Sequence, residues 1–344
     1  MVMYSESDLN QAVEAGVLAP EAAAAFRDHV ALGRSAPAVD EESFRLLTGF
    51  NDIFVSIALT LLLVAIGQIG ERIAEPVAGI GVAVAAWLLA EYFTRARRMA
   101  LPSILLLLAF VGGVAASLVG VMVRINPDLS DQQNAAILAG IAAVSAGAAY
   151  LHWRRFMVPI TVAAGAVAAV GVVIGLIFAV IPMDEDALYP IALVAGLAVF
   201  GLAMRWDMSD RERRTRRSDV AFWLHLAAAP LIAHPIFQML GVFGSDITPA
   251  TGVVVMLLYV GFGFVALAVD RRALLVSSLV YVLYAMYALF AKAGALELSA
   301  ALTALVIGSA LLTLSAFWHS MRGFVVAMLG SLQHRLPPVA LRAA

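Results

Sequence analysis

The chain has 344 residues, of which 62% are apolar and 13% are charged, and its formal net charge is −2. Soluble domains average roughly 45–50% apolar residues and about a quarter charged residues, so a single soluble core is excluded. The near-neutral charge, without a broad basic face, excludes a nucleic-acid-binding protein. Cysteine is absent, which excludes disulfides, thiolate nucleophiles and cysteine-ligated metal centres.

The first 35 residues are polar enough to form a small cytosolic domain. Ser7 can cap a helix that ends at Gly16, and Pro20 can open a second helix, because proline suits a first turn and glycine a C-terminus. The apolar seam of this helical hairpin is expected to consist of Leu9, Val13, Leu18, Phe26 and Val30. Residues 36–50 then form a linker and a short amphipathic helix that lies at the membrane interface.

Ten apolar runs follow, and a membrane-spanning helix needs about 20 apolar residues. The runs lie near 51–69, 76–93, 101–123, 134–151, 157–181, 189–204, 219–241, 250–269, 273–291 and 299–320. The sequence therefore predicts an all-α polytopic membrane helix bundle of about ten spans over residues 51–320. Residues 321–344 are predicted to form a C-terminal interfacial helix, FVVAMLGSLQHRL, and a tail.

Basic residues are concentrated at the two ends of the chain and in alternate loops. Nineteen of the 22 basic residues fall on one side of the predicted membrane, which leaves Arg72, Arg124 and Lys292 on the other. The nineteen are Arg27, Arg34, Arg45, Arg95, Arg97, Arg98, Arg154, Arg155, Arg205, Arg211, Arg213, Arg214, Arg216, Arg217, Arg271, Arg272, Arg322, Arg335 and Arg342. Cytoplasmic loops retain Arg and Lys, so both termini are predicted to be cytoplasmic.

The arginine turns also suggest an internal repeat. Arg98, Arg155, Arg214 and Arg272 are 57, 59 and 58 residues apart, which is the length of two spans. We interpret this as five helical hairpins in series, with residues 101–151 and 159–204 as two of them. Evenly sized helices with positive inside loops would give the same spacing. An inverted repeat of five plus five spans, typical of carriers, lacks matching pairs here.

The seventh run carries the least ordinary polar residues. His234 and Gln238 are four apart and share a helix face, whereas His225 lies nine residues before His234 on the opposite face. Pro230 and Pro235 each free a carbonyl and predict a kink. A neutral imidazole at this depth can relay protons or bind a solute, or it can donate a hydrogen bond to a carbonyl that Pro230 frees. His225 is expected nearer the cytoplasmic surface, at the interface.

Tyrosines on the next two runs complete a candidate site. Tyr281 and Tyr284 lie three apart near the middle of the ninth run, and Tyr259 lies on the eighth. They can form hydrogen bonds between helices or line a cavity with the seventh run. The candidate polar cavity therefore consists of His234, Gln238, Tyr259, Tyr281 and Tyr284.

The remaining polar residues of the spans are secondary candidates. Asp52 and Glu91 lie near cytoplasmic span ends, where they can reach water or a nearby arginine, and His225 is a third candidate. Gly171 and Gly175 form a GxxxG pattern that favours close helix packing. Walker A, HExxH and GxSxG patterns are missing, so no catalytic residue, metal or cofactor is predicted. Whether the protein is an enzyme stays open, with a non-enzymatic role favoured.

Three segments resemble a known family. DLNQAVEAGVLAPEAAAAF, FRLLTGFNDIFVSIAL and FWLHLAAAPLIAHPIF are similar to an uncharacterised family of bacterial multi-pass inner-membrane proteins with a short N-terminal cytosolic helical hairpin. The resemblance implies a location in the bacterial inner membrane and supplies no activity or catalytic residue.

Two functions remain open from the sequence. The first is a carrier or channel for a small solute that passes along the polar residues of the seventh to ninth runs. The second is a non-transporting membrane scaffold or sensor whose N-terminal hairpin binds a cytosolic protein partner. In both cases the lipid bilayer is the principal surrounding of the chain.

Overall fold

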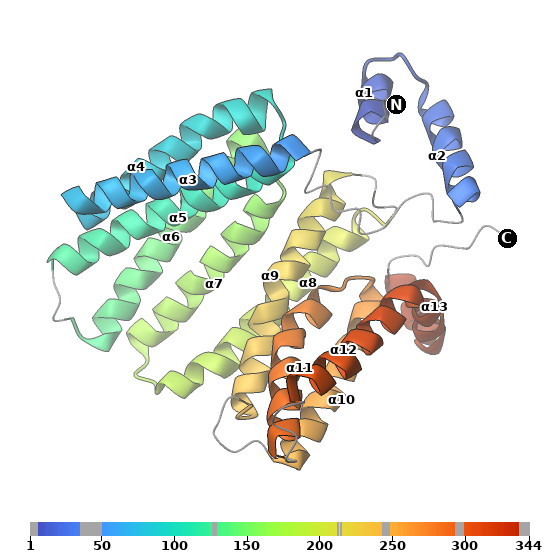
Figure 1. Cartoon of the computed structure of the whole chain (residues 1–344). Coiled ribbons are helices and arrows are strands. Elements are labelled where there is room, and N and C mark those ends of the chain that lie inside the picture. The colour runs from blue at the N-terminus through green and yellow to red at the C-terminus, as the bar shows by residue number, and fades with distance from the viewer. Residues whose placement is uncertain are drawn as a thin grey trace. The chain divides into compact units, whose positions relative to one another are not determined.

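The computed structural model describes residues 6–34, 50–125, 129–211, 213, 215–242, 248–292 and 299–336. Within these ranges every regular element is a helix (Figure 1), so the predicted all-α fold class is confirmed. The chain divides into two compact units, one with the first two helices and one with all later helices. The predicted linker and interfacial helix over residues 36–49, and the tail after Leu336, lie outside the described residues.

The first unit is the predicted helical hairpin, built from α1 (Glu6–Glu14) and α2 (Pro20–Arg34). The chain turns at Gly16, whose φ of 70° favours glycine. Arg27 donates a hydrogen bond of 2.7 Å to the Oδ1 atom of Asn10 on the facing helix. The predicted seam is wrong at Phe26, which is 55% exposed, because Ala23 takes the buried position on α2 instead.

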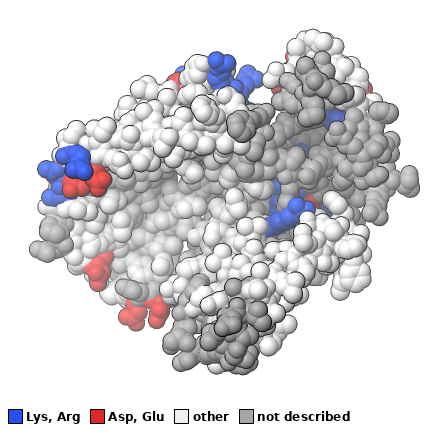
Figure 2. Space-filling view, in the orientation of Figure 1, with Lys and Arg blue, Asp and Glu red and all other residues white. Residues whose placement is uncertain are grey.

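In the second unit, one helix corresponds to each of the ten predicted apolar runs. These helices are α3 (Phe50–Ile73), α4 (Glu75–Ala90) continued by the π-helix η1 (Glu91–Ala96), α5 (Ala100–Ile125), α6 (Asp131–Phe156), α7 (Ile160–Val180), α8 (Leu188–Met208), α9 (Arg216–Met239), α10 (Pro249–Val269), α11 (Ala273–Lys292) and α12 (Ser299–Ala316). A short 3-10 helix, η2 (Glu185–Ala187), precedes α8. Figure 2 shows charged side chains gathered in small patches, with wide uncharged surface between them.

Eight of these helices in the described part of the chain, α3 to α10, are long and apolar enough to cross a membrane. The apolar stretch of α11 is shorter, at Ala273–Ala288, and α12 reaches the required length only together with the helix that follows. That pair would raise the number of spans to nine. Within the described residues, length and composition thus support eight or nine spans, close to the predicted number of about ten.

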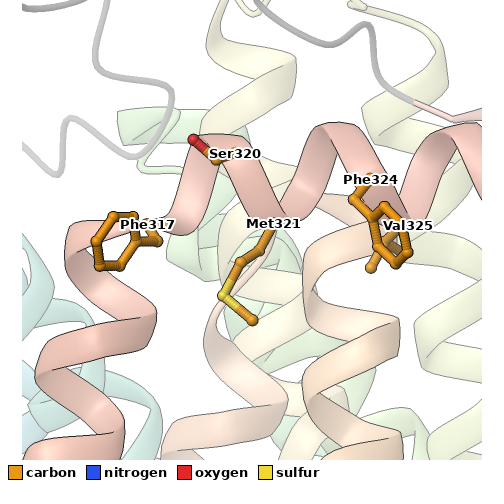
Figure 3. A pocket seen from close by; sticks show the side chains of 5 residues that line it. All are labelled: Phe317, Ser320, Met321, Phe324 and Val325. Carbon is orange, nitrogen blue, oxygen red and sulfur yellow. The ribbon is translucent and has the colours of Figure 1, made fainter.

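The last predicted span is interrupted. We expected it to continue to residue 320 and an interfacial helix to start at Phe324, but α12 ends at Ala316 and α13 (Trp318–Met328) begins two residues later. The two helices meet at 77°, and Figure 3 shows this corner at Phe317. The 3-10 helix η3 (Gly330–Arg335) follows. Trp318 and Arg322, in the first two turns of α13, are held by a buried carboxylate, described below.

Neighbouring helices pair across the arginine turns. The three most extensive contacts join α4 to α5, α6 to α7 and α8 to α9 across these turns; the contact of α3 with α4 comes next, and then that of α10 with α11 across the last arginine turn. Each of these turns contains one residue in the left-handed region: Arg98, Met157, Arg213 or Asp270, with φ of 53°, 55°, 51° and 58°. The predicted hairpins, 101–151 and 159–204, grouped the helices differently. Helices α5 and α6, and helices α7 and α8, pack on each other less extensively than the pairs joined by arginine turns do. Most of the arginine turns are shorter than the turns within the predicted hairpins, so they hold their two helices closer together.

Small residues allow the helix pairs to approach closely. A Cβ atom at Gly175 would lie 2.9 Å from Ala139 Cβ, and one at Gly171 would lie 3.3 Å from Ala142 Cβ. The GxxxG pattern thus lies where α7 packs on α6, as expected for small residues between spans. The most buried candidate span is α9, which contacts α7, α8 and α11 and forms the centre of the later half of this unit.

Candidate functional site

A buried ionic network lies at the arginine-rich ends of the later helices. Its carboxylates are Asp207, in the last turn of α8, and Asp270, in the turn between α10 and α11. Its other members come from the arginine turns, α9 and α13. Both carboxylates are almost completely buried, with 1% and 2% of their surface exposed. A charge in such a place is costly unless it is paired and hydrogen-bonded.

Asp207 is paired with Arg271 in a two-point contact. Arg271 donates from Nη2 to Oδ1 at 2.7 Å and from Nε to Oδ2 at 3.2 Å. The Nε2 atom of His225, on α9, lies 3.4 Å from Oδ2, and the Nε atom of Arg213 lies 3.6 Å from Oδ1. His225 is therefore buried in the network, and the expectation that it meets the membrane interface is wrong. Its side chain turns towards α8 because the carboxylate offers the nearest polar partner.

Asp270 is held by three groups from two places in the chain, the α8–α9 turn and α13. Arg213 donates from Nη1 to Oδ2 at 2.8 Å, and Trp318 donates from Nε1 to Oδ1 at 2.9 Å. The Nε atom of Arg322, on α13, lies 3.3 Å from the same Oδ1 atom. Asp270 can occupy its left-handed position because aspartate tolerates that region better than most residues. The backbone turn thereby places the carboxylate against α13.

The network joins five segments of the second unit: α8, the α8–α9 turn, α9, the α10–α11 turn and α13. A buried ion pair contributes little net stability compared with a well-packed apolar core, but loss of one partner leaves an uncompensated buried charge. Such pairs are best suited to fixing one arrangement of helices against another. Among the described residues, no group of three or more His, Asp or Glu side chains is arranged to hold a metal ion.

The candidate polar cavity is assembled only in part. The Nδ1 atom of His234 lies 2.8 Å from the hydroxyl of Tyr281 on α11, and Phe237 stacks on the Tyr281 ring with centroids 4.5 Å apart. His234 itself remains exposed. Gln238 lies partly buried one turn further along α9.

The two other tyrosines of the candidate set lie in different surroundings. Tyr259 is buried on α10, and Tyr284 is 40% exposed. Helix α9 continues without interruption through Pro230, which is exposed, and Pro235, which is buried. The kink at these prolines stays a prediction.

Two secondary candidates lie at the arginine-rich end of the earlier helices. Glu91 accepts hydrogen bonds of 2.7 and 2.9 Å from Arg155 and one of 3.3 Å from Arg95. Asp52, on α3, is 3% exposed and lines a pocket of about 460 Å³ together with Tyr92 and other residues. A second pocket, of about 380 Å³, lies on α13 between Phe317 and Val325, and its wall is almost entirely apolar (Figure 3).

Sequence reasoning missed most of the ionic network. Asp207, Asp270, Trp318 and Arg322 stand at span ends or in turns, where charged and aromatic residues are ordinary. The one available signal was Asp270, which directly precedes an arginine pair.

Sequence reasoning also missed His152, on α6. This residue is fully buried against the rings of Trp87, Phe110 and Phe156.

The fold is an all-α bundle in which many helices are suited to a bilayer. Comparison with known proteins does not define the class of protein further. The sequence matches no known protein family, and no similar curated protein or solved structure was found.

Proposed function

We propose that the protein is a carrier for a small solute in the bacterial inner membrane and that the ionic network closes its cytoplasmic side. The observation that carries this proposal is the presence of two polar layers on α9. His225 belongs to the network, and His234, nine residues later, pairs with Tyr281. At 1.5 Å per residue the two layers are roughly 13.5 Å apart along the helix.

The arrangement of the network supports a role in gating. It joins turns and helix ends through charged contacts that are specific in geometry yet weak in net stability. Helices joined in this way can separate and reassociate when a bound solute favours the open arrangement. The His234–Tyr281 pair supplies hydrogen-bonding groups beyond the gate. A solute that they recognise is expected to be small and largely uncharged, or to be coupled to protons.

The orientation follows from the distribution of basic residues. Contacts between Glu91 and Arg155, and between Asp207 and Arg271, join consecutive arginine turns, so these turns lie on one side. The sequence predicts nineteen of the 22 basic residues on that side, and on this ground we assign it to the cytoplasm together with both termini. Reporter fusions to the C-terminus test this assignment, and an external C-terminus would contradict it.

The absence of cysteine allows a clean test of gating. A single cysteine at Ala229, buried on α9 between the two layers, is treated with a membrane-impermeant maleimide in right-side-out and inside-out vesicles. In the otherwise unchanged chain we expect it to react little from the cytoplasmic side. Adding Trp318→Phe, which removes one hydrogen bond to Asp270, should raise cytoplasmic labelling several-fold. A cysteine at Val253, an exposed position on α10, is the control whose labelling should not change.

The same experiment can contradict the proposal. If labelling at position 229 is unaffected by Trp318→Phe and also by Arg322→Gln, the network does not control access to the interior. A structural role in helix packing would then account for it fully.

A second candidate function is favoured by the first unit. Val17 and Phe26 of the helical hairpin are 81% and 55% exposed, and exposed apolar side chains favour contact with another protein. A membrane scaffold or sensor that binds a cytosolic partner through this hairpin would use them. Deletion of residues 6–34 separates the two functions, because a carrier should keep its gated labelling pattern, whereas a scaffold should lose its partner.

A further inference from the structure

Helix α13 presents one face to the bundle and leaves an apolar face uncovered. Trp318, Arg322 and Val326 are 3%, 1% and 6% exposed, and the first two contact Asp270. Four large apolar residues form an apolar stripe on another side of the same helix. They recur every three or four residues and are 58%, 42%, 69% and 64% exposed: Phe317, Met321, Phe324 and Met328. Exposed apolar patches mark contacts with a membrane, a ligand or another protein.

Contacts on both sides of α13 place it at the level where the spans end. At its start, Trp318 and Arg322 contact Asp270, which lies in the turn between α10 and α11. After its end, the carbonyl of Leu336 accepts a hydrogen bond of 3.2 Å from Arg211, in the turn between α8 and α9. Two turns between candidate spans therefore hold the segment from α13 to the end of η3, so both ends of this segment lie at the arginine-rich ends of the spans.

The corner at Phe317 changes the direction of the chain from crossing the membrane to running along its surface. Helix α12 has 18 residues, or a length of roughly 27 Å at 1.5 Å per residue, close to the hydrocarbon thickness of about 30 Å. Helix α13 then departs at 77°. Figure 3 shows Met321 on the side of α13 from which α12 descends, and Ser320 on the opposite side. The apolar stripe therefore faces the depth of the acyl chains.

The apolar stripe continues the exposed face of α12. Leu305 and Leu312, seven residues apart on one side of α12, are 67% and 74% exposed, and the corner follows directly. The apolar pocket of about 380 Å³ lies along the same stripe. The only arginine, lysine or carboxylate within α13 is Arg322, which is buried against Asp270. A continuous apolar surface without charge fits acyl chains better than it fits a specific protein partner.

We propose that the apolar stripe of α13 docks among the acyl chains of the leaflet at the arginine-rich ends of the spans, and that this docking holds Trp318 and Arg322 against Asp270. Interfacial helices bind by burying apolar area, usually with help from basic residues. Because α12 tethers α13 beside the bilayer, attraction by charge is not needed here. The inference rests on the membrane location of the chain and does not depend on transport.

Fluorescence quenching in vesicles of the full-length protein tests the docking. Since the chain has no cysteine, Phe324→Cys can be labelled at one site with bimane. His319→Cys is the matched control, because His319 is also exposed on α13 but lies roughly 140° around the helix from Phe324. The vesicles contain phosphatidylcholine with brominated acyl chains, or ordinary phosphatidylcholine with iodide on both sides. We expect bromine to quench the label at position 324 several-fold more than the label at position 319, and iodide to do the reverse.

A second measurement tests whether the docking supports the contact with Asp270. Val326→Cys places a cysteine on the buried face of α13, where a maleimide should react slowly in vesicles. Adding Phe324→Ser, which removes apolar area from the stripe but little packing within the protein, should raise this labelling several-fold. Phe324→Leu, which keeps an apolar side chain, should leave the labelling unchanged, and so should His319→Ser.

Three results would overturn the proposal. If iodide quenches the labels at positions 324 and 319 equally and brominated lipid quenches neither, the stripe is open to water. If the label at position 324 is shielded from both quenchers, another protein or a second copy of this chain covers the stripe. If Phe324→Ser leaves the labelling at position 326 unchanged, contact with lipid does not hold α13 against Asp270.

Discussion

Glu91 accepts two hydrogen bonds from Arg155, which lies 64 residues later in the chain. Asp207 and Arg271 are separated by the same 64 residues and form the same two-point contact. In both cases a carboxylate at the end of one span binds the arginine of the next arginine turn. The earlier ion pair is half-exposed, whereas the later one is buried. The chain therefore contains two ion pairs of the same kind that differ in their exposure to solvent.

The first prediction compares these two ion pairs by removing each carboxylate. Asp207→Asn leaves Arg271 in a buried site without its counter-charge, whereas Arg213 keeps Asp270. Loss of one partner of a buried pair costs about 3–5 kcal/mol of stability. Glu91→Gln should change stability little, because solvent screens its partners. Thermal unfolding of both variants in the same detergent measures the difference. Equal melting temperatures would show that burial does not distinguish the two ion pairs.

The second prediction concerns the attachment of α13. Trp318→Phe keeps an aromatic ring but removes the Nε1 donor to Asp270, and a hydrogen bond to a charged group contributes about 1.5–3 kcal/mol. We expect a lower melting temperature and faster proteolysis between α12 and α13. Phe324→Leu, at a position on α13 that is 69% exposed, is the control. Unchanged proteolysis in Trp318→Phe would mean that the corner at Phe317 does not depend on this hydrogen bond.

The sequence was sufficient to predict the fold class because apolar runs of span length have few other uses, and each run became a helix. It also indicated the turn at Gly16, where a glycine between two helical patterns marks a chain reversal. The ionic network could not be predicted, since it depends on which way Asp207 and His225 face across two helices. Nothing in the composition of 299–320 signals the corner at Phe317, and the partner of Trp318, Asp270, lies 48 residues earlier in the chain.

For the candidate site, too, the sequence could not predict which side chains meet across two helices. Helical spacing correctly separated His225 from His234 on α9, since one contacts Asp207 and the other Tyr281. Spacing along one helix gives no information about the neighbour that each face meets. The pairing of His234 with Tyr281 required the packing of α9 on α11.

The third prediction uses the buried histidine of α6. His152 is fully buried, and its Nε2 atom has no hydrogen-bond partner among the described residues. A buried polar group without a partner costs free energy, and an apolar group of similar shape removes that cost. The Nδ1 atom of the same ring lies 3.4 Å from the buried Thr161 hydroxyl, and His152→Phe removes this long contact as well. His152→Phe should therefore be about as stable as the unchanged protein. His152→Ala should lose about 2–5 kcal/mol, as for other large-to-small changes in a core.

These two variants distinguish a packing role from a chemical one. A strong destabilisation by His152→Phe, measured by thermal unfolding, would show that a hydrogen bond of a ring nitrogen is essential for folding. If His152→Phe is as stable as the unchanged protein and His152→Ala is folded but less stable, this position requires the volume of a ring.

The fourth prediction concerns the contact between α8 and α9, which places Asp207 beside His225. A Cβ atom at Gly196 would lie 2.8 Å from the backbone carbon and oxygen of Leu231. Because backbone atoms cannot rotate away, Gly196→Ala must push the two helices apart, and overpacking of this kind costs about 1–3 kcal/mol. Gly201, on the same helix, has nothing within 4 Å of an added Cβ. Gly201→Ala should be neutral or slightly stabilising, because alanine favours a helix more than glycine does.

Thermal unfolding and cysteine cross-linking between α8 and α9 measure the two effects separately. Gly196→Ala should lower the melting temperature and slow the cross-link, and Gly201→Ala should do neither. Since the shift at Gly196 is transmitted along α8 to Asp207, it should also increase cytoplasmic labelling of the cysteine at position 229 if the network acts as a gate. A destabilised Gly196→Ala protein with unchanged labelling would show that this contact supports the fold without controlling access.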